Sequence, residues 1–435
     1  MSEIVRVQEI NHKSAYIKII PKNCFNLVTI ISNVSTSDLS FASNGSFKDF
    51  VSVLLARRDS YRARRFSLKL RSLDFDSDTY NLVSDCVRNV LNRGVLFLEL
   101  DVNVEEGYAL PSEVFTCKKV VKLRLGSGFV IENIPKEALF PSLKDLLLDR
   151  VIFNDTNGDC AFTKLVSACP VLEELVIYRN KNDDWKWSRV VSSQILKRLT
   201  IRCEESGYYE GCSYEPISFD TPSLEYFEYC DVIRDEYPVV NLNSLVKAKL
   251  ELPFFMGGDD YDASNLMKGM KNVQILSLGA AETMQVIWTF REAVPVFENL
   301  YDLSLSTEED FCWDALPILL DKSPNLKTLT IEALHYTSEC NGDVNSVCKC
   351  LKGYSFLLSS HIEVLKITQF EGNIREMVQV MHVLEKLQRL ELLELHIQEN
   401  EDDLKLQIML DLLMLPRASS KCKVLVDFPE QTPVC

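Results

Sequence analysis

Four soft metal ligands lie close together in one segment of the sequence. The stretch HYTSECNGDVNSVCKC contains His335, Cys340, Cys348 and Cys350. Imidazole and thiolate groups could close a tetrahedral zinc site, but the C-x₇-C-x-C spacing lacks the C-x₂₋₄-C knuckle of structural zinc sites. The alternative is a loop between structural units, in which cysteines act as small, partly buried apolar residues. The spacing favours the loop, so we expect no metal and no other cofactor.

Motifs that assemble catalytic groups do not occur in the chain. There is no G-x-x-x-x-G-K-[ST], no H-E-x-x-H and no G-x-S-x-G, and the sequence has only five histidines. Asp74, Asp76 and Asp78 in LDFDSD could bind a divalent cation, but the glycine and distal glutamate of a calcium loop are missing, which favours a solvated turn. We therefore predict no catalytic residues and a protein that is not an enzyme.

The charge of the chain limits the classes of partner. The 435 residues are 46% hydrophobic and 25% charged, with a formal net charge of −16. Such a field repels phosphate backbones and anionic membrane surfaces. The basic stretch RRDSYRARR, Arg57 to Arg65, could be a nuclear-localisation or RNA-contact patch, or a solvated loop before the strand FSLKL. We predict a protein partner, with no nucleic acid and no membrane.

The N-terminal residues bear on the compartment. Residues 1–30 lack the basic, apolar and small-residue regions of a secretory signal, and no run approaches the roughly 20 apolar residues that cross a bilayer. We expect a cytoplasmic or nuclear protein, in which the 14 cysteines are reduced thiols.

One apolar pattern, L-x-x-L-x-L with Val, Ile, Phe or Ala substituting for Leu, recurs along the chain. Its spacing runs from 21 to 36 residues, close to the period of about 20 to 29 that is typical of leucine-rich repeats. The pattern begins at Val95, Val120, Leu143, Leu172, Leu196, Leu224, Leu245, Val273, Leu300, Leu326, Ile362 and Leu390.

Between the strands the chain often changes to a helical period, so the expected unit is a strand followed by a helix. In LKTLTI, Leu329 and Ile331 lie two residues apart and share one side of a strand. Other segments show a helical period, namely FTKLVSACP, DALPILLDKSP and IREMVQVMHVLEKLQ. In the last of these, the predicted buried stripe is Ile374, Met377, Val378, Met381, Leu384 and Leu387. Pro141, Pro170, Pro222 and Pro324 are expected where a helix ends and a strand begins.

Strands that return through helices run parallel, and stacking them gives a repeat solenoid. We therefore predict an α/β fold, a leucine-rich-repeat solenoid whose curved parallel β-sheet has helices or loops on its convex side. Side chains between and just after the paired apolar positions would form an open concave face that binds a partner. They are Glu99, Asp101, Arg124, Asp149, Tyr178, Thr200, Arg202, Lys249, Glu251, Glu332, Lys366, Thr368 and His396.

Tryptophans and acidic clusters have two interpretations each. Trp185 and Trp187 in DDWKWSRVVSS could anchor a partner or cover a gap between repeats, and Trp288 is expected on a buried helix face. The acidic segments KNDDW, GGDDYDASN, STEEDF and QENEDDLK are either solvated loops or an acidic rim that steers a basic partner.

Several segments resemble the plant F-box proteins that carry leucine-rich repeats followed by a C-terminal FBD region. These are FPSLKDLLLDRVIF, LVSACPVLEELVI, SSQILKRLTI and the ending DLLMLPRASSKCKVLVDF. The segments FKDFVSVLLARRDSYRARRFSLKLRS and VRNVLNRGVLFLELDV resemble the part that follows the F-box in this family. The resemblance covers residues 46–428. It implies three regions: residues 1–45 without a recognisable F-box, a solenoid over 46–355, and an FBD region over 356–435 that continues and caps the solenoid.

The resemblance also implies a role. Proteins of this family are substrate-recognition parts of SCF-type (Skp1–cullin–F-box) ubiquitin ligases, and their F-box docks a Skp1-type adaptor. Residues 1–45 lack the Leu-Pro opening and the tryptophans expected of an F-box. The alternatives are a truncated gene product, a degenerate F-box in these residues, or a stand-alone interaction or decoy protein. In each case the chain is expected to be a non-catalytic protein-interaction module.

Overall fold

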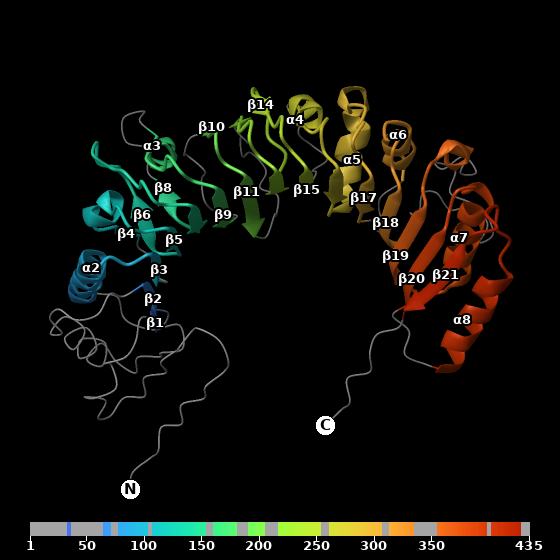
Figure 1. Cartoon of the computed structure of the whole chain (residues 1–435), viewed down its shortest axis with the longest axis horizontal. Helices are drawn as coiled ribbons and strands as arrows, with labels where there is room; N and C mark the ends of the chain where they lie inside the picture. The colour runs from blue at the N-terminus through green and yellow to red at the C-terminus, as the bar shows by residue number, and fades with distance from the viewer. Residues whose placement is uncertain are drawn as a thin grey trace, which may run out of the picture. The chain divides into compact units, whose positions relative to one another are not determined.

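The computed structural model describes eleven segments of the chain, which are residues 33–35, 64–70, 77–102, 107–153, 160–180, 190–204, 216–253, 261–306, 313–334, 355–397 and 402–427. The chain divides into two units, Met1–Ser188 and Arg189–Cys435. Each unit contains a parallel β-sheet in which successive repeats contribute successive strands (Figure 1).

The first unit has a sheet of order β1-β2-β3-β5-β7-β9 and a short second sheet of order β4-β6-β8. Its elements are β1 (Asn33–Ser35), β2 (Arg65–Leu70), α2 (Ser77–Asn92), β3 (Phe97–Val102), β4 (Tyr108–Ala109), the 3₁₀ helix η2 (Ser112–Thr116), β5 (Lys122–Leu125), β6 (Phe129–Ile131), β7 (Asp145–Asp149), β8 (Ile152–Phe153), α3 (Ala161–Ser167) and β9 (Glu174–Asn180).

The second unit has a main sheet of order β11-β13-β15-β16-β17-β18-β19-β20-β21 and a short sheet of order β10-β12-β14. Its strands are β10 (Val190–Ser192), β11 (Arg198–Glu204), β12 (Ser218–Asp220), β13 (Tyr226–Cys230), β14 (Val240–Asn241), β15 (Lys247–Glu251), β16 (Ile275–Leu278), β17 (Asp302–Leu305), β18 (Thr328–Ala333), β19 (Val364–Phe370), β20 (Leu392–Ile397) and β21 (Lys423–Asp427).

Helices cover one face of this second sheet, as Figure 1 shows for α4, α5 and α6. The helices of the unit are α4 (Ser264–Gly269), α5 (Ala281–Thr289), η3 (Arg291–Ala293), α6 (Ala315–Asp321), α7 (Ile374–Lys386) and α8 (Asp402–Met414). The other face carries no helix among the described residues. The α/β leucine-rich-repeat architecture expected from the sequence is therefore confirmed.

The recurring apolar pattern forms the core. All twelve residues at which the pattern begins are buried, and none is more than 2% exposed. The strand residues that follow alternate between buried and partly exposed, as in β18, where Leu329 and Ile331 are buried and their neighbours are not. Burial of a large apolar side chain contributes roughly 1.5–3 kcal/mol, so stacked repeats stabilise one another through these rows.

Two of the four prolines follow a helix, as predicted. Pro170 comes after α3 and Pro324 after α6. For Pro141 and Pro222 the prediction is wrong: Pro141 follows a turn-rich connection, and Pro222 follows β12. Those repeats return through short parallel strands such as β12, whose Phe219 is buried against the aromatic residues of β13.

Helix α7 occupies the predicted segment and buries part of the predicted stripe: Leu384 and Leu387 are buried, whereas Met377, Val378 and Met381 are only partly buried. Ile374 is 62% exposed, whereas Glu376 and Gln379 are buried together with Val380 and Leu384. The carboxylate of Glu376 accepts hydrogen bonds from the backbone N–H groups of residues 371, 372 and 373, which turns this face inward. Asn373 completes a capping box by accepting from the N–H groups of the first helical turn.

Trp288 was expected on a buried face of its helix. In α5 it is half-buried, and the guanidinium of Arg291 lies 5.1 Å from the centroid of its ring. The expectation was therefore correct for the helix and wrong for the depth of burial, because the end of α5 lies at the surface.

A buried ion pair follows β13 in the second unit. The Arg234 guanidinium lies 2.5 Å from the Asp231 carboxylate, and their side chains are 6% and 0% exposed. Asp231 also accepts from the backbone N–H of Val232 at 2.8 Å. Nearby, the Tyr237 hydroxyl accepts from the Arg234 N–H and donates to the Tyr229 hydroxyl. Buried charges require such partners, so this cluster fixes the chain after β13.

Candidate protein-interaction surface

The face of each sheet opposite the buried leucines carries mostly polar side chains in rows, and we call it the open face. In parallel strands in register, residues at equal positions lie side by side. In the second unit, the first row is Arg198, Tyr226, Lys247, Ile275, Asp302, Thr328, Val364, Leu392 and Lys423. The second row is Thr200, Glu228, Lys249, Ser277, Ser304, Thr330, Lys366, Glu394 and Leu425.

A glutamate anchors the open face of the first unit. The Glu99 carboxylate accepts from the Ser67 hydroxyl at 2.7 Å and lies 3.0 Å from the Lys69 ammonium and 4.0 Å from the Arg124 guanidinium. Burial alone would raise the pKa of Glu99, but the hydrogen bonds from Ser67 and Lys69 hold it below its ordinary value. Three neighbouring strands are therefore linked by one ionised group.

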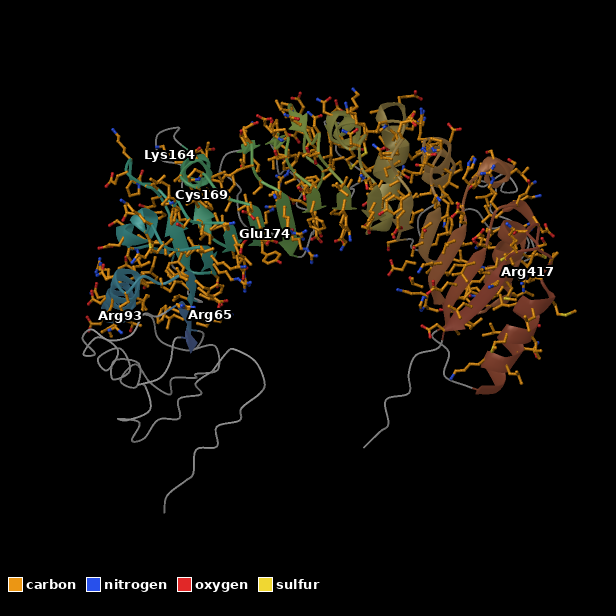
Figure 2. The ribbon with its side chains drawn as sticks, in the orientation of Figure 1. Arg65, Arg93, Lys164, Cys169, Glu174 and Arg417 are labelled. Atoms are coloured by element: carbon orange, nitrogen blue, oxygen red, sulfur yellow. The ribbon has the colours of Figure 1, made fainter. Side chains whose placement is uncertain are left out.

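Arg65 on β2 and Phe97 on β3 lie side by side on the open face of the first unit. The Arg65 guanidinium lies 4.3 Å from the Phe97 ring centroid, within the range of a cation–π interaction. Figure 2 labels Arg65 on β2 and Glu174 on β9, and Lys164 and Cys169 in the segment that contains α3 and leads into β9.

A second glutamate has the same role in the second unit. Glu228 is 6% exposed although it lies on the open face. Its carboxylate contacts the Arg202 guanidinium, accepts from the Tyr226 hydroxyl at 2.9 Å and lies 3.7 Å from the Lys249 ammonium. Lys249 also lies 2.6 Å from Glu251. Burial and the bond to Glu228 raise the pKa of Tyr226 to about 12, so this hydroxyl remains a donor.

A third cluster lies on β19, β20 and β21. The Lys366 ammonium lies 2.8 Å from Glu394, and this hydrogen bond lowers the pKa of the Glu394 carboxyl despite partial burial. The imidazole of His396 lies between two carboxylates, 3.2 Å from Glu394 and 3.1 Å from Asp427. Contacts of Glu394 and His396 therefore link the three strands.

Charge is divided unevenly along the open face of the second unit. The strands β11, β13 and β15, which we call the basic half, carry four cations and two carboxylates among the open-face side chains that the structure describes: Arg198, Arg202, Lys247, Lys249, Glu228 and Glu251. The strands β17 to β21, the acidic half, carry four carboxylates and two lysines: Asp302, Glu332, Glu394, Asp427, Lys366 and Lys423. These twelve described side chains thus carry no net charge, whereas the chain has a formal net charge of −16.

All thirteen residues predicted to bind a partner lie on open-face positions of the strands. They are Glu99 and Asp101 on β3, Arg124 on β5, Asp149 on β7, Tyr178 on β9, Thr200 and Arg202 on β11, Lys249 and Glu251 on β15, Glu332 on β18, Lys366 and Thr368 on β19, and His396 on β20. The structure brings Arg202, Lys249 and Glu251 together around Glu228, and Lys366 and His396 together at Glu394. Their role in binding stays a prediction.

The sequence reasoning missed two of the three carboxylates around which the clusters form, Glu228 and Glu394, and it also missed Lys69, the partner of Glu99. Glu228 lies between the aromatic residues Phe227 and Tyr229, and Lys69 lies on a strand before the first recognised repeat. The first row was also missed, because only residues after the first core position were considered. The in-register pairing of the strands identifies all of these positions at once.

Several sequence hypotheses fall outside the described residues. These are the possible zinc ligands at 335–350, Asp74 and Asp76, most of the basic stretch 57–65, the tryptophans at 185 and 187, most of the acidic clusters, and nearly all of residues 1–45. Among the residues that are described, no group of three His, Cys, Asp or Glu side chains could hold a metal ion. No helix in this part of the chain has the length and apolarity to cross a membrane.

Comparison with known proteins gives the family. The leucine-rich-repeat model of the FBD-associated F-box protein At5g56370 matches residues 83–239. F-box protein At3g62430 of Arabidopsis thaliana is 63% identical over 415 residues, covering 95% of this chain and 94% of that protein. The chain belongs to the plant F-box/LRR-repeat family. Putative F-box/LRR-repeat protein At5g15620 of the same plant is 58% identical, with 95% and 94% of the two chains covered.

More distant members of the F-box/LRR-repeat family align over a similar length. F-box/LRR-repeat protein At3g62440 of Arabidopsis thaliana is 43% identical over 436 residues, covering 94% of each chain. The resemblance inferred from the sequence is therefore confirmed. Membership of this family supports a protein-interaction module.

Proposed function

We propose that the open face of the sheet in the second unit holds a protein partner, and that the chain is the substrate-recognition part of an SCF-type ubiquitin ligase adaptor. The observation that carries the proposal is the division of this face into a basic half and an acidic half. A partner with an acidic segment next to a basic one would match it, because opposite charges guide both the orientation and the rate of association.

The face is prepared for binding by its internal contacts. Arg202 and Lys249 are held by the buried Glu228, while their side chains remain 45% and 32% exposed. Side chains that are already ordered lose less conformational entropy on binding. A partner carboxylate could then share these cations without the cost of immobilising them.

The proposed role involves no reacting group in this chain. A ligase adaptor raises the local concentration of its target beside the ubiquitin-carrying enzyme, and selectivity comes from surface complementarity. The partner that the open face selects would be the protein that is modified.

A charge reversal on the first row tests the binding face. Lys247 is exposed on β15, so Lys247→Glu reverses a charge in the basic half without exposing Glu228. Lys271→Glu makes the same change outside the open face and is the matched control. Partners captured by the full chain are identified by mass spectrometry, and their affinity is measured by surface plasmon resonance. We expect Lys247→Glu to weaken binding about tenfold and Lys271→Glu to have little effect. Equal effects of the two variants would reject the face.

Coupling to a ligase is tested separately with a purified Skp1-type adaptor and the full chain. Stoichiometric binding that is lost when Ile30 and Ile31 are changed to Asp would support the ligase role and a degenerate F-box in residues 1–45. No binding of the adaptor, with binding of the partner intact, would favour the second candidate, a stand-alone interaction or decoy protein. The segment NCFNLVTIISNVSTSDLSF, which lacks the expected F-box residues, is the observation that keeps this candidate.

A further inference from the structure

The last strand of the second unit is incompletely covered. In the other strands of its sheet both core-facing residues are buried, as Leu393 and Leu395 are in β20. In β21 the equivalent residues Val424 and Val426 are only half-buried, and Leu425 on the open face is 51% exposed. Within the described part of the chain, β20 is the one strand that pairs with β21. The core therefore continues to an open edge.

Helix α8, which contacts β21, is apolar on two opposite sides. Ile408 and Leu412 are buried against the rest of the unit. On the opposite side, at helical spacing, Leu406, Leu410 and Leu413 are 59%, 50% and 64% exposed. An apolar stripe on a helix normally packs against other protein. Six of the 17 large apolar residues that are exposed in the described segments lie within residues 402–427, so the apolar surface is concentrated here.

The backbone of β21 has groups that point away from β20. The N–H of Lys423 donates to the carbonyl of Glu391, which lies just before β20, at 2.9 Å. Because alternate residues of a strand direct their N–H and C=O groups to the same side, those of Val424 and Val426 point to the open edge. Such an edge is a template for another strand unless it is blocked.

The side chains of β21 are complementary to a second copy of the same strand. In an antiparallel pair centred on Leu425, Lys423 of one copy lies opposite Asp427 of the other, twice. Leu425 then lies opposite its own symmetry mate in a non-hydrogen-bonded pair, where side chains approach most closely. Val424 and Val426 form the hydrogen-bonded pairs, in agreement with the direction of their backbone groups.

We propose that two copies of this chain associate through antiparallel pairing of their β21 edges, with the exposed sides of their α8 helices packed together beneath the joined sheet. A two-fold axis normal to the sheet keeps the open face of both copies on one side and both α8 helices on the other. Arg417, labelled in Figure 2, lies between α8 and β21, and its guanidinium donates to the Cys422 carbonyl at 3.0 Å. This bond lies within the short connection from α8 to β21, which keeps the two elements close to each other.

Backbone and apolar variants test the pairing in the full chain. Val424→Pro removes an N–H that points to the open edge and leaves the ladder to β20 intact. Leu425→Asp sets two carboxylates against each other at the axis. We expect light scattering to give twice the 49.7 kDa of one chain for the wild type over a micromolar concentration series, and one chain for either variant. Val296→Asp, an exposed apolar residue away from this edge, should remain dimeric. Circular dichroism confirms folding of each variant.

A charge exchange tests the register of the pairing. Lys423→Asp alone and Asp427→Lys alone each create like-charge pairs across the axis, and each should weaken the dimer at least about tenfold. The double variant K423D/D427K restores both pairs and should restore the dimer. A monomeric wild type would overturn the proposal. So would a dimer that survives Val424→Pro, a double variant that is no better than the singles, or a different protein bound at this edge.

Discussion

The buried ion pair after β13 gives a quantitative prediction. Asp231→Ala leaves the Arg234 guanidinium without its carboxylate in a site where the arginine side chain is 6% exposed, and it removes the acceptor for the Val232 N–H. Breaking a buried pair on one side costs about 3–5 kcal/mol. Because repeat arrays open locally, we expect the loss in the repeats around β13 and β15 and not in the whole chain.

Hydrogen exchange measured by mass spectrometry locates this loss. A cost of about 3–5 kcal/mol accelerates exchange of the protected amides by roughly two to four powers of ten. Asp321→Ala removes an exposed carboxylate in α6 and serves as the control. The double variant D231A/R234M, which removes both charges, should recover much of the protection. Acceleration of less than about tenfold in Asp231→Ala, or acceleration spread evenly over the chain, would refute the reasoning.

Three further predictions concern the C-terminal repeats. Asn373→Ala removes the cap of α7, and we expect a loss of about 1 kcal/mol and faster exchange in its first turn, whereas Asn373→Asp should retain the cap. Burial raises the pKa of the Glu376 carboxyl from 4.5 to about 7. The folded state therefore binds the proton more tightly than the unfolded state, and the stability falls as pH rises between these values. Thermal melts of Glu376→Gln should lose this pH dependence, and an unchanged pH profile would contradict the prediction. Leu365 lines an apolar cavity of about 20 Å³ with Trp313 and Val380. Leu365→Ala should enlarge this cavity and lower the free energy of unfolding, measured in urea, by about 2–5 kcal/mol. A loss below about 1 kcal/mol would show that the surrounding side chains collapse into the space.

Prediction from the sequence was most successful where the hydrophobic periodicity of a single segment determines its structure. The twelve apolar patterns gave the buried rows because alternation along a strand fixes which side chains face inward, whatever the neighbouring repeat contains. The same alternation placed all thirteen predicted binding residues on the open face. Pro170 and Pro324 were assigned correctly because a helical period precedes each of them.

Other features depend on contacts between repeats, which the local pattern does not contain. The short strand β12 replaces a helix because Phe219 finds aromatic partners on β13. The buried face of α7 is displaced because Glu376 accepts three backbone hydrogen bonds. Glu228 is an ordinary acidic residue in the sequence and becomes an anchor only when Arg202 and Lys249 lie on the adjacent strands.

The alternation of buried and open positions also separates two kinds of inherited change. Substitutions in the buried leucine rows alter the stability of the repeats. Most substitutions in the rows of the open face instead alter the pattern of charge that a partner meets. Glu99 and Glu228 are exceptions, since each links several strands. A gene duplicate could therefore acquire a new target through a few outward residues while its scaffold stays unchanged.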